Sequence, residues 1–504
     1  MSKGKLLAIV IVWLVVFGVG AVTWKWFLRP RQQQAQQRAR EERLDVGTSA
    51  SRYRQQLVLA LDSFSGYAIL RSAAFREELA KQQIRVQLRD DGADYAARIR
   101  GLQSGEVQMA AFTVDTLIAS SAGLGDLPAT AVAIVDETRG ADAIVAYRDL
   151  IGTIDDLNRS DLKFVLTPNS PSETLARVVT TQFHLGNLAA DPFVRTKDAA
   201  EVYQIYADAK PAEPLAYVLW EPYVSKILEN EKMHVVVDSS RFHGYIVDVL
   251  VVSRDYLAKH EPIVRQVVAC YFRAAYQHRT KLAELVLADA RQTGQPLTQA
   301  QAEKLTDGIW WKNTQENMAH FGLRPGLQHI EDMMANVTQV LVKSHAIPAD
   351  PTSGQPNRLY YDKVLSSLQQ ENFHPGAADE EIRDDLIRLP SLTAAQWEQL
   401  APVGTLDVEP LVFARGTSTL TESSKRVLDD LAQKLKSSRY YVLIRGNASR
   451  RGNLAANQDL ANQRAEVAAQ HLIGKGIDQD RVRAVAAEPS GETSVTFHLG
   501  EIPY

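Results

Sequence analysis

The feature that most constrains the fold is an alternation of short apolar runs and amphipathic helical stretches between Gln56 and Ser253. Apolar runs of about four to eight residues are typical of buried strands, and helices between such runs let successive strands pair in parallel. The order predicts an α/β domain with mainly parallel strands. The expected strands are QQLVLAL, IRVQLRD, VQMAAF, ATAVAIV, DAIVAY, LKFVLT, LAYVLW, MHVVVD and VDVLVVS.

Helical spacing of apolar residues fills the segments between these strands and dominates the chain after Pro262. Such spacing places the apolar side chains on one face of each helix, which can then cover a sheet. The expected helices are residues 68–82, 95–102, 172–184, 199–206, 264–289, 299–321, 327–345 and 362–369.

The C-terminal part of the chain has a composition break before it. Residues 376–404 combine Pro390 and Pro402 with an acidic cluster, which is typical of a linker. Beyond it, residues 405–504 predict a β-α-β-α-β order. The expected elements are strand LDVEPLVFARG, helix 422–436, strand YYVLIRG, helix 457–475, and strands RVRAVAAE and SVTFHLG.

The N-terminal residues 6–24, LLAIVIVWLVVFGVGAVTW, carry no charge. As a helix they would reach about 28 Å, close to the hydrocarbon thickness of a bilayer. A cleaved signal peptide is the alternative, but the apolar run is long for one, and bulky WKWFLRPR follows instead of a small-residue cleavage site. We therefore expect a transmembrane anchor at residues 1–28. The polar, Gln/Arg-rich residues 29–50 that follow are expected to form a stalk.

Length and composition exclude several classes of function. A chain of 504 residues exceeds the size of one hydrophobic core, and its net charge of −4 offers no bulk positive charge for nucleic acid. The single cysteine, Cys270, excludes an internal disulfide framework. Catalytic motifs such as G-x-S-x-G, H-E-x-x-H, a Walker loop and C-x-x-C are absent, and the histidines lack ligand-spaced partners. We therefore expect no enzyme activity, no cofactor and no metal.

Residues 51–375 resemble the solute-binding proteins of nitrate/sulfonate/bicarbonate ABC transporters. The resemblance rests on IRGLQSGEVQMAAFTVDTLIAS, on IGTIDDLNRSDLKFVLTPNSPSETL, on LAYVLWEPYVSKIL, and on YIVDVLVVSRDYLAKHEPIVRQVVACYFRA, in the order of that family. It implies a two-lobed type II periplasmic-binding-protein fold with a ligand cleft between the lobes.

The segment PNSPSET, residues 168–174, is the strongest candidate for contact with a ligand. A helix that starts at Ser170, with proline in its first turn, has free backbone N–H groups and a positive dipole end that attract anions. A merely capped helix is the alternative. The predicted ligand-binding residues in this segment are Ser170, Ser172, Glu173 and Thr174.

Other candidates follow the carboxyl ends of expected strands, where parallel sheets present ligand-binding groups. Trp220 could close over a ligand, although a tryptophan here can equally belong to the core or hinge. The acidic residues Asp62, Asp115 and Glu221 argue against an anion, so the charge of the solute stays open. The further candidates are Ser65, Gly66, Tyr67, Thr113, Asp115, Trp220 and Glu221.

Residues 408–482 resemble the OmpA-like domain, most specifically in N-x-x-L-x-x-x-R-A, here Asn457, Leu460 and Arg464 with the following alanine. The resemblance implies that Arg464 grips the carboxylate of diaminopimelate in peptidoglycan, which suits the guanidinium fork. The family's second gripping residue is an aspartate in G-H-T-D-x-x-G. Here the run begins at Gly446 and Asn447, and Ser449 replaces the carboxylate, so this position offers no ion pair to the ligand's ammonium.

Two hypotheses follow for the function. In the first, a protein anchored in the bacterial inner membrane, with its domains in the periplasm, senses a solute or cell-wall fragment and is tethered to peptidoglycan through Asn447, Ser449, Asn457, Leu460 and Arg464. In the second, both modules are docking surfaces of an inner-membrane complex for envelope stress or phage defence. More basic residues follow the apolar segment than precede it, and by the positive-inside rule this disfavours export of the C-terminal side. The resemblance of the domains to periplasmic proteins overrides that rule in our expectation.

Overall fold

The computed structural model describes residues 53–294, 297–378, 380–383, 389–488 and 495–503. The expected anchor, residues 1–28, and stalk, residues 29–50, lie outside these ranges. Within the ranges described, no helix is both long and apolar enough to cross a bilayer.

The first lobe is built on a six-stranded sheet with the order β11-β4-β10-β3-β1-β2. Strand β1 pairs in parallel with β2 and β3, whereas β10 is antiparallel to both β3 and β4. Strands β3, β4 and β10 are buried on both faces, which explains their nearly continuous apolar sequences, whereas the edge strand β2 alternates between buried and half-buried residues. The strands of this sheet are β1 (Gln55–Leu61), β2 (Ile84–Asp90), β3 (Met109–Thr113), β4 (Ala129–Thr138), β10 (Val247–Ser253) and β11 (Ile309–Trp311).

The second lobe is built on a five-stranded sheet with the order β7-β6-β8-β5-β9. Strand β6 is parallel to β7 and β8, and β5 is antiparallel to β8 and β9. The strands are β5 (Asp142–Tyr147), β6 (Lys163–Leu166), β7 (Phe193–Arg195), β8 (Leu215–Trp220) and β9 (Met233–Asp238).

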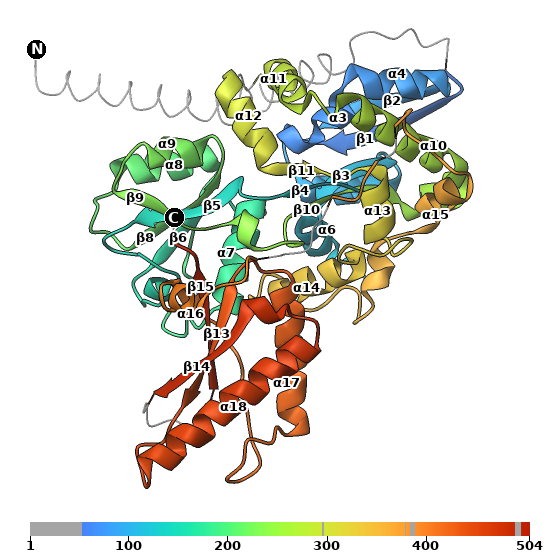
Figure 1. Cartoon of the computed structure of the whole chain (residues 1–504). Helices are drawn as coiled ribbons and strands as arrows, with labels where there is room; N and C mark the ends of the chain where they lie inside the picture. Colours follow the sequence, from blue (N-terminus) through green and yellow to red (C-terminus); the bar gives the residue numbers. More distant parts are fainter. Residues whose placement is uncertain (1–52, 295–296, 379, 384–388, 489–494, 504) are drawn as a thin grey trace, which may run out of the picture.

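The two sheets share one topology. The first five strands of the first sheet, counted from β2, lie in the order β2-β1-β3-β10-β4, and those of the second sheet lie in the equivalent order β7-β6-β8-β5-β9. In each sheet the fourth strand in space, β10 or β5, is the one that follows a crossing from the other lobe. The chain crosses between the lobes twice, from β4 to β5 and from β9 to β10, so both crossings form a hinge (Figure 1). This arrangement confirms the two-lobed binding-protein fold that the resemblance implied.

Helices cover both sheets and the outer side of the first lobe. The long α10 is kinked at His260, where Pro262 in the next turn removes a backbone donor. The helices of the two lobes are α3 (Ala68–Arg71), α4 (Ala73–Lys81), α5 (Tyr95–Ser104), α6 (Val114–Ser121), α7 (Pro171–Gln182), α8 (Ala199–Asp208), α9 (Tyr223–Leu228), α10 (Arg254–His278), α11 (Leu282–Gln292), α12 (Gln299–Asp307), α13 (Thr314–His320), α14 (Ile330–Lys343) and α15 (Lys363–Gln370).

The C-terminal region forms a four-stranded sheet, β12-β15-β13-β14, covered by two helices (Figure 1). Gly446 lets β13 approach α18 closely, because a Cβ at this position would lie 2.1 Å from the Ala461 carbonyl oxygen. The elements are α16 (Ala394–Glu398), β12 (Ala401–Thr405), α17 (Glu422–Lys436), β13 (Tyr441–Asn447), α18 (Leu454–Gly474), β14 (Val482–Glu488) and β15 (Val495–Glu501).

All nine strands expected in residues 56–253 are present, and the sequence missed β7 and β11. The helix expected over residues 299–321 is wrong, since α12 ends before Gly308 and β11 pairs with β4 at the sheet edge. The strand LDVEPLVFARG is also wrong: among the described residues it forms only two isolated bridges, Leu406 to Phe183 and Phe413 to Leu420. Strand β15 pairs instead with β13 and with β12, and β12 begins within the expected linker.

Candidate ligand cleft and peptidoglycan site

A cavity of about 540 Å³ lies between the two lobes. It collects side chains from loops after β1, β3, β6 and β8 and from the start of β5, and residues of α11 and α12 close one side. The carboxyl ends of strands from both lobes therefore meet at this cavity, the position at which α/β sheets bind ligands. We call it the cleft.

The structure places six of the predicted ligand-binding residues on the wall of the cleft. These are Ser65, Tyr67, Thr113, Ser170, Trp220 and Glu221. The other five, Gly66, Asp115, Ser172, Glu173 and Thr174, are buried beside the cleft and do not line it. Their contacts show how they support the wall.

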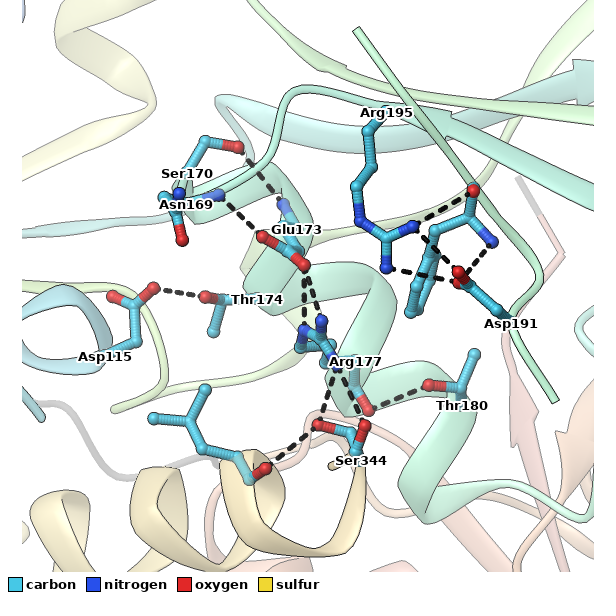
Figure 2. A network of polar contacts seen from close by, with 12 residues as sticks. Asp115, Asn169, Ser170, Glu173, Thr174, Arg177, Thr180, Asp191, Arg195 and Ser344 are labelled. Atoms are coloured by element: carbon cyan, nitrogen blue, oxygen red, sulfur yellow. Dashed lines mark hydrogen bonds and ion pairs between the residues drawn. The ribbon is translucent and has the colours of Figure 1, made fainter. Parts of the chain in front are cut away.

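The start of α7 is capped by its own side chains (Figure 2). The Ser170 hydroxyl accepts a hydrogen bond from the Glu173 amide at 3.3 Å, and the Glu173 carboxylate accepts one from the Asn169 amide at 2.6 Å. Glu173 also pairs with Arg177 at 2.6 Å. A protein carboxylate therefore already occupies the positive end of this helix, which weakens the interpretation of PNSPSET as an anion site.

Two further predicted residues on α7 hold buried carboxyl groups. The Ser172 hydroxyl donates to Asp142 at 2.7 Å, and the Thr174 hydroxyl donates to Asp115 (Figure 2 shows the second contact). Helix α7 thus connects the wall of the second lobe to Asp115 in the first lobe.

The loop after β1 positions Tyr67 and Gly66. The Tyr67 hydroxyl donates to Asp248 on β10, and the Trp311 indole donates to the Gly66 carbonyl at 2.7 Å. A Cβ on Gly66 would lie 2.4 Å from an oxygen of Asp136, so only glycine allows this close approach. Gly66 therefore has a packing role.

The cleft is acidic. Of the described residues that line it, five carry carboxyl groups and one, Lys197, is basic. The carboxyl residues are Asp62, Asp142, Asp198, Glu221 and Asp248. Three of them have cationic partners: Asp62 pairs with Arg98 at 3.0 Å, Glu221 with Lys304 at 2.7 Å, and Asp198 with Lys197 at 3.8 Å.

Asp142 and Asp248 form no ion pair within the described ranges. Burial, together with the charge of nearby Asp115, raises the pKa of Asp142 to about 7. Burial also raises the pKa of Asp248 well above its ordinary value, and the charge of Asp136 adds to this effect. Burial raises the pKa of Asp136 to about 8. Asp136 and Asp248 are register partners on β4 and β10, so the pair can share a proton.

Sequence reasoning missed Asp142, Asp248 and Asp136 as site residues. Each stands within or at the end of an otherwise apolar run, in DAIVAY, VDVLVVS and ATAVAIVDET. Burying a charged residue in a strand covered on both faces costs free energy. An aspartate in such an apolar run was therefore the sequence signal for a functional residue.

The candidate peptidoglycan site lies between β13 and α18. The Asn457 side chain donates to the backbone carbonyls of Ser449 and Arg451, both at 2.8 Å, and so holds the loop after β13. Asn447 ends β13 and is buried, and Leu460 is half-buried on α18. Two turns beyond Asn457, Arg464 donates to the Thr417 carbonyl at 3.0 Å.

The setting of Arg464 combines aromatic and polar contacts. Its guanidinium lies 4.8 Å from the centre of the Phe413 ring, and burial lowers its pKa somewhat. The Ser449 hydroxyl accepts a hydrogen bond from the Arg451 amide at 3.2 Å. The loop thus presents a neutral hydroxyl where the OmpA-like pattern has a carboxylate.

Comparison with protein families matches residues 412–494 to the OmpA family. This match confirms the resemblance of the C-terminal region to that family. A search of curated proteins found no match to this chain.

Solved structures similar to the chain include three sulfonate-binding proteins. The periplasmic sulfonate-binding protein SsuA from Methylobacillus flagellatus KT has 11% identity and a TM-score of 0.48, and the match covers 64% of this chain and 98% of that one. The aliphatic sulphonate binding protein SsuA from Escherichia coli has 14% identity, a TM-score of 0.45, and coverages of 66% and 96%. The alkanesulfonate-binding protein SsuA from Xanthomonas axonopodis pv. citri, bound to MOPS, has 14% identity, a TM-score of 0.43, and coverages of 58% and 95%.

Proposed function

We propose that this chain is a non-catalytic binding protein of the bacterial envelope, which binds a small solute in the cleft and attaches to peptidoglycan through its C-terminal domain. The observation that carries the proposal is the cleft itself, where polar and aromatic side chains from both lobes converge on one cavity. Cavities of this size between two lobes are typical small-molecule sites. The OmpA match supports the second half of the proposal.

The proposed periplasmic location rests on the N-terminal residues. An anchor at residues 1–28 and a stalk at residues 29–50 would hold the described domains in the periplasm, between the inner membrane and the cell wall. The nineteen uncharged residues from Leu6 to Trp24 support this part of the proposal. A reporter fused to the C-terminus should be active only outside the cytoplasm, and activity confined to the cytosol would contradict the location.

Solute binding is tested by thermal unfolding of the full chain in detergent with a panel of anionic, cationic and neutral solutes. A ligand at about 100 times its dissociation constant should add roughly 2.7 kcal/mol to the free energy of unfolding. The Trp220→Ala variant should lose much of this stabilisation, because Trp220 lines the cleft and is half-buried there. If no solute stabilises either form, the cleft is not a binding site for the classes tested.

Attachment to the wall is tested by co-sedimentation of the full chain with purified peptidoglycan. We expect Arg464→Ala to weaken retention about tenfold or more, because a guanidinium–carboxylate pair is a strong charge-assisted contact. Arg426→Ala is the matched control, since it removes an exposed arginine from the neighbouring helix α17. Equal retention of all three forms would show that Arg464 does not carry the attachment.

A second function is a docking subunit of an inner-membrane complex, and Ser449 favours it. A neutral hydroxyl cannot form the ion pair that an aspartate gives to an ammonium group, and Arg450 and Arg451 follow it directly. Under this alternative, neither peptidoglycan nor any solute would be retained.

A further inference from the structure

We infer that the cleft binds a small organic cation, held by Asp142 and Asp248 and surrounded by the rings of Phe64, Tyr67 and Trp220. All five residues line the cavity. This inference rests on the proposed function, because it names the class of solute for the same cleft.

Among the carboxyl groups that line the cleft, these two have no cationic partner within the described ranges. Asp62, Glu221 and Asp198 each have a cationic partner, as described above. Asp142 accepts a hydrogen bond from Ser172, and Asp248 accepts one from Tyr67, but within the described ranges no cation reaches either. One oxygen of Asp248 is fully buried without a hydrogen-bond donor among the residues described. A buried carboxyl group without a partner is costly, and a bound cation would remove that cost.

Two more carboxyl groups lie behind the wall and add negative potential when they are ionised. Asp115 is buried, and one of its oxygens has no donor in the described part of the chain. Asp136 is fully buried beside Asp248, and neither of its oxygens has a donor there. In a region of low dielectric constant, each of these carboxyl groups, once ionised, attracts a cation more strongly than it would in water.

The two carboxyl groups come from opposite sides of the hinge. Asp142 is the first residue of β5, directly after the crossing into the second lobe, and Asp248 lies on β10, directly after the return crossing. A cation in contact with both would join the two lobes, so its binding would favour the closed arrangement. Trp220 pairs in register with Asp142 and brings a ring from the second lobe to the same place.

The aromatic lining suits an organic cation. The rings of Phe64 and Tyr67 lie edge to face at 5.4 Å, and the Tyr67 hydroxyl is fixed on Asp248. Aromatic faces attract ammonium groups, most strongly when water is excluded. In the ranges that the structure describes, no three His, Cys, Asp or Glu side chains are placed to hold a metal ion, so the geometry favours an ammonium group.

An anion finds less support in the same cleft. The start of α7 is occupied by Glu173, and Lys197, the basic lining residue, lies next to Asp198. A sulfonate would also be repelled by Asp142 and Asp248 whenever these groups are ionised.

The test uses four hydroxyethyl compounds that differ only in the terminal group: choline, ethanolamine, the neutral choline isostere 3,3-dimethylbutan-1-ol, and the anion isethionate. Each is titrated calorimetrically into the full chain in detergent. We expect saturable binding of choline or ethanolamine, and binding of the neutral isostere weaker by about tenfold or more.

Asp142→Asn and Asp248→Asn should each weaken binding of the cation about tenfold or more, because one carboxylate contact is lost. Both amides can still accept the hydrogen bonds from Ser172 and Tyr67, so the wall should keep its shape. Asp126→Asn is the matched control, since it removes an exposed carboxylate from the first lobe outside the cleft. Unfolding curves show whether each variant is folded.

Three results would overturn the inference. Preferential binding of isethionate would leave the proposed solute-binding function intact and show that the ligand is anionic. Equal binding of choline and its neutral isostere would show that Asp142 and Asp248 act as protonated, neutral groups. Failure of all four compounds would refute the cation assignment, while the broader solute panel would still decide whether the cleft binds any solute.

Discussion

Asp142 shows how one buried side chain can make stability depend on pH. Its carboxyl group is buried at the start of β5, accepts a hydrogen bond from Ser172 and lies near Asp115. Burial raises the pKa of Asp142 to about 7, whereas an aspartate in an unfolded chain has a pKa of about 3.9. The folded state therefore binds the proton more tightly than the unfolded state.

The sign of the effect follows from this difference in pKa. Between about pH 4 and pH 7 the folded chain holds more protons than the unfolded chain, so its free energy of unfolding decreases as the pH rises and levels off above the folded pKa. Asp136, whose pKa burial raises to about 8, extends the decrease. We expect Asp142→Asn to flatten the curve by removing one of the groups, as measured by denaturant unfolding from pH 5 to pH 8.

The control for this measurement is Asp126→Asn, which removes an exposed carboxyl group and should leave the slope of the native chain unchanged. A native chain whose stability is constant or increases over this range would contradict the prediction.

At the scale of single elements, local sequence rules determine where α7 begins, and tertiary contacts then connect it to α14. Ser170 is the N-cap, Pro171 lies in the first turn, and Glu173 and Arg177 form an i,i+4 pair. Arg177 also donates to the Ser344 carbonyl at 3.0 Å, just after α14 (Figure 2). The helix therefore links the cleft wall of the second lobe to α14.

The strands next to the hinge depart from their apolar pattern close to the cleft. Strands β4, β5 and β10 are almost completely buried, and their apolar residues meet the rule for strands covered on both faces. Asp136, Asp142 and Asp248 break this rule at the ends that meet the cleft. Local departures from a consistent pattern are expected at functional sites, and these three residues fit that expectation.

At the scale of the whole molecule, the C-terminal domain packs against the second lobe and the hinge. The His243 amide donates to the Ser437 carbonyl at 2.7 Å, and the Arg439 amide donates to the Arg241 carbonyl at 3.1 Å. Arg241 also pairs with Glu501 at 2.7 Å. The chain segment that returns from the second lobe to the first is thus bound by the domain that resembles OmpA.

The Phe242 ring lies at the centre of this contact, about equally far from the rings of Phe183, Tyr245 and Tyr440. We expect Phe242→Ala to destabilise the contact by about 3–5 kcal/mol, because it removes a buried aromatic side chain. Hydrogen exchange should then accelerate at the His243 and Arg439 amides, which bond across the contact.

The amides of β1 pair within the first lobe and serve as the internal reference for this measurement. Val412→Ala, at an exposed position of the C-terminal domain, is the matched control variant. Unchanged exchange at the two amides in Phe242→Ala would show that the other contacts are enough to hold the domain on the hinge.

The sequence by itself determined the nine strands before Arg254, the capped start of α7 and the OmpA-like pattern around Arg464. These features depend on short-range rules: the period of apolar residues, the residue types at helix starts, and the spacing of a motif. Short strands at sheet edges were missed because three residues, as in β7 and β11, carry too little periodic signal.

Only the tertiary structure decided which residues meet. Asp136 and Asp248 lie far apart in the sequence and become neighbours because β10 inserts between β3 and β4. Glu173, predicted to contact a ligand, instead caps its own helix. Strand order, register and burial arise from packing between distant segments. Burial in turn raises the pKa of the aspartates at the cleft above the value of an exposed aspartate.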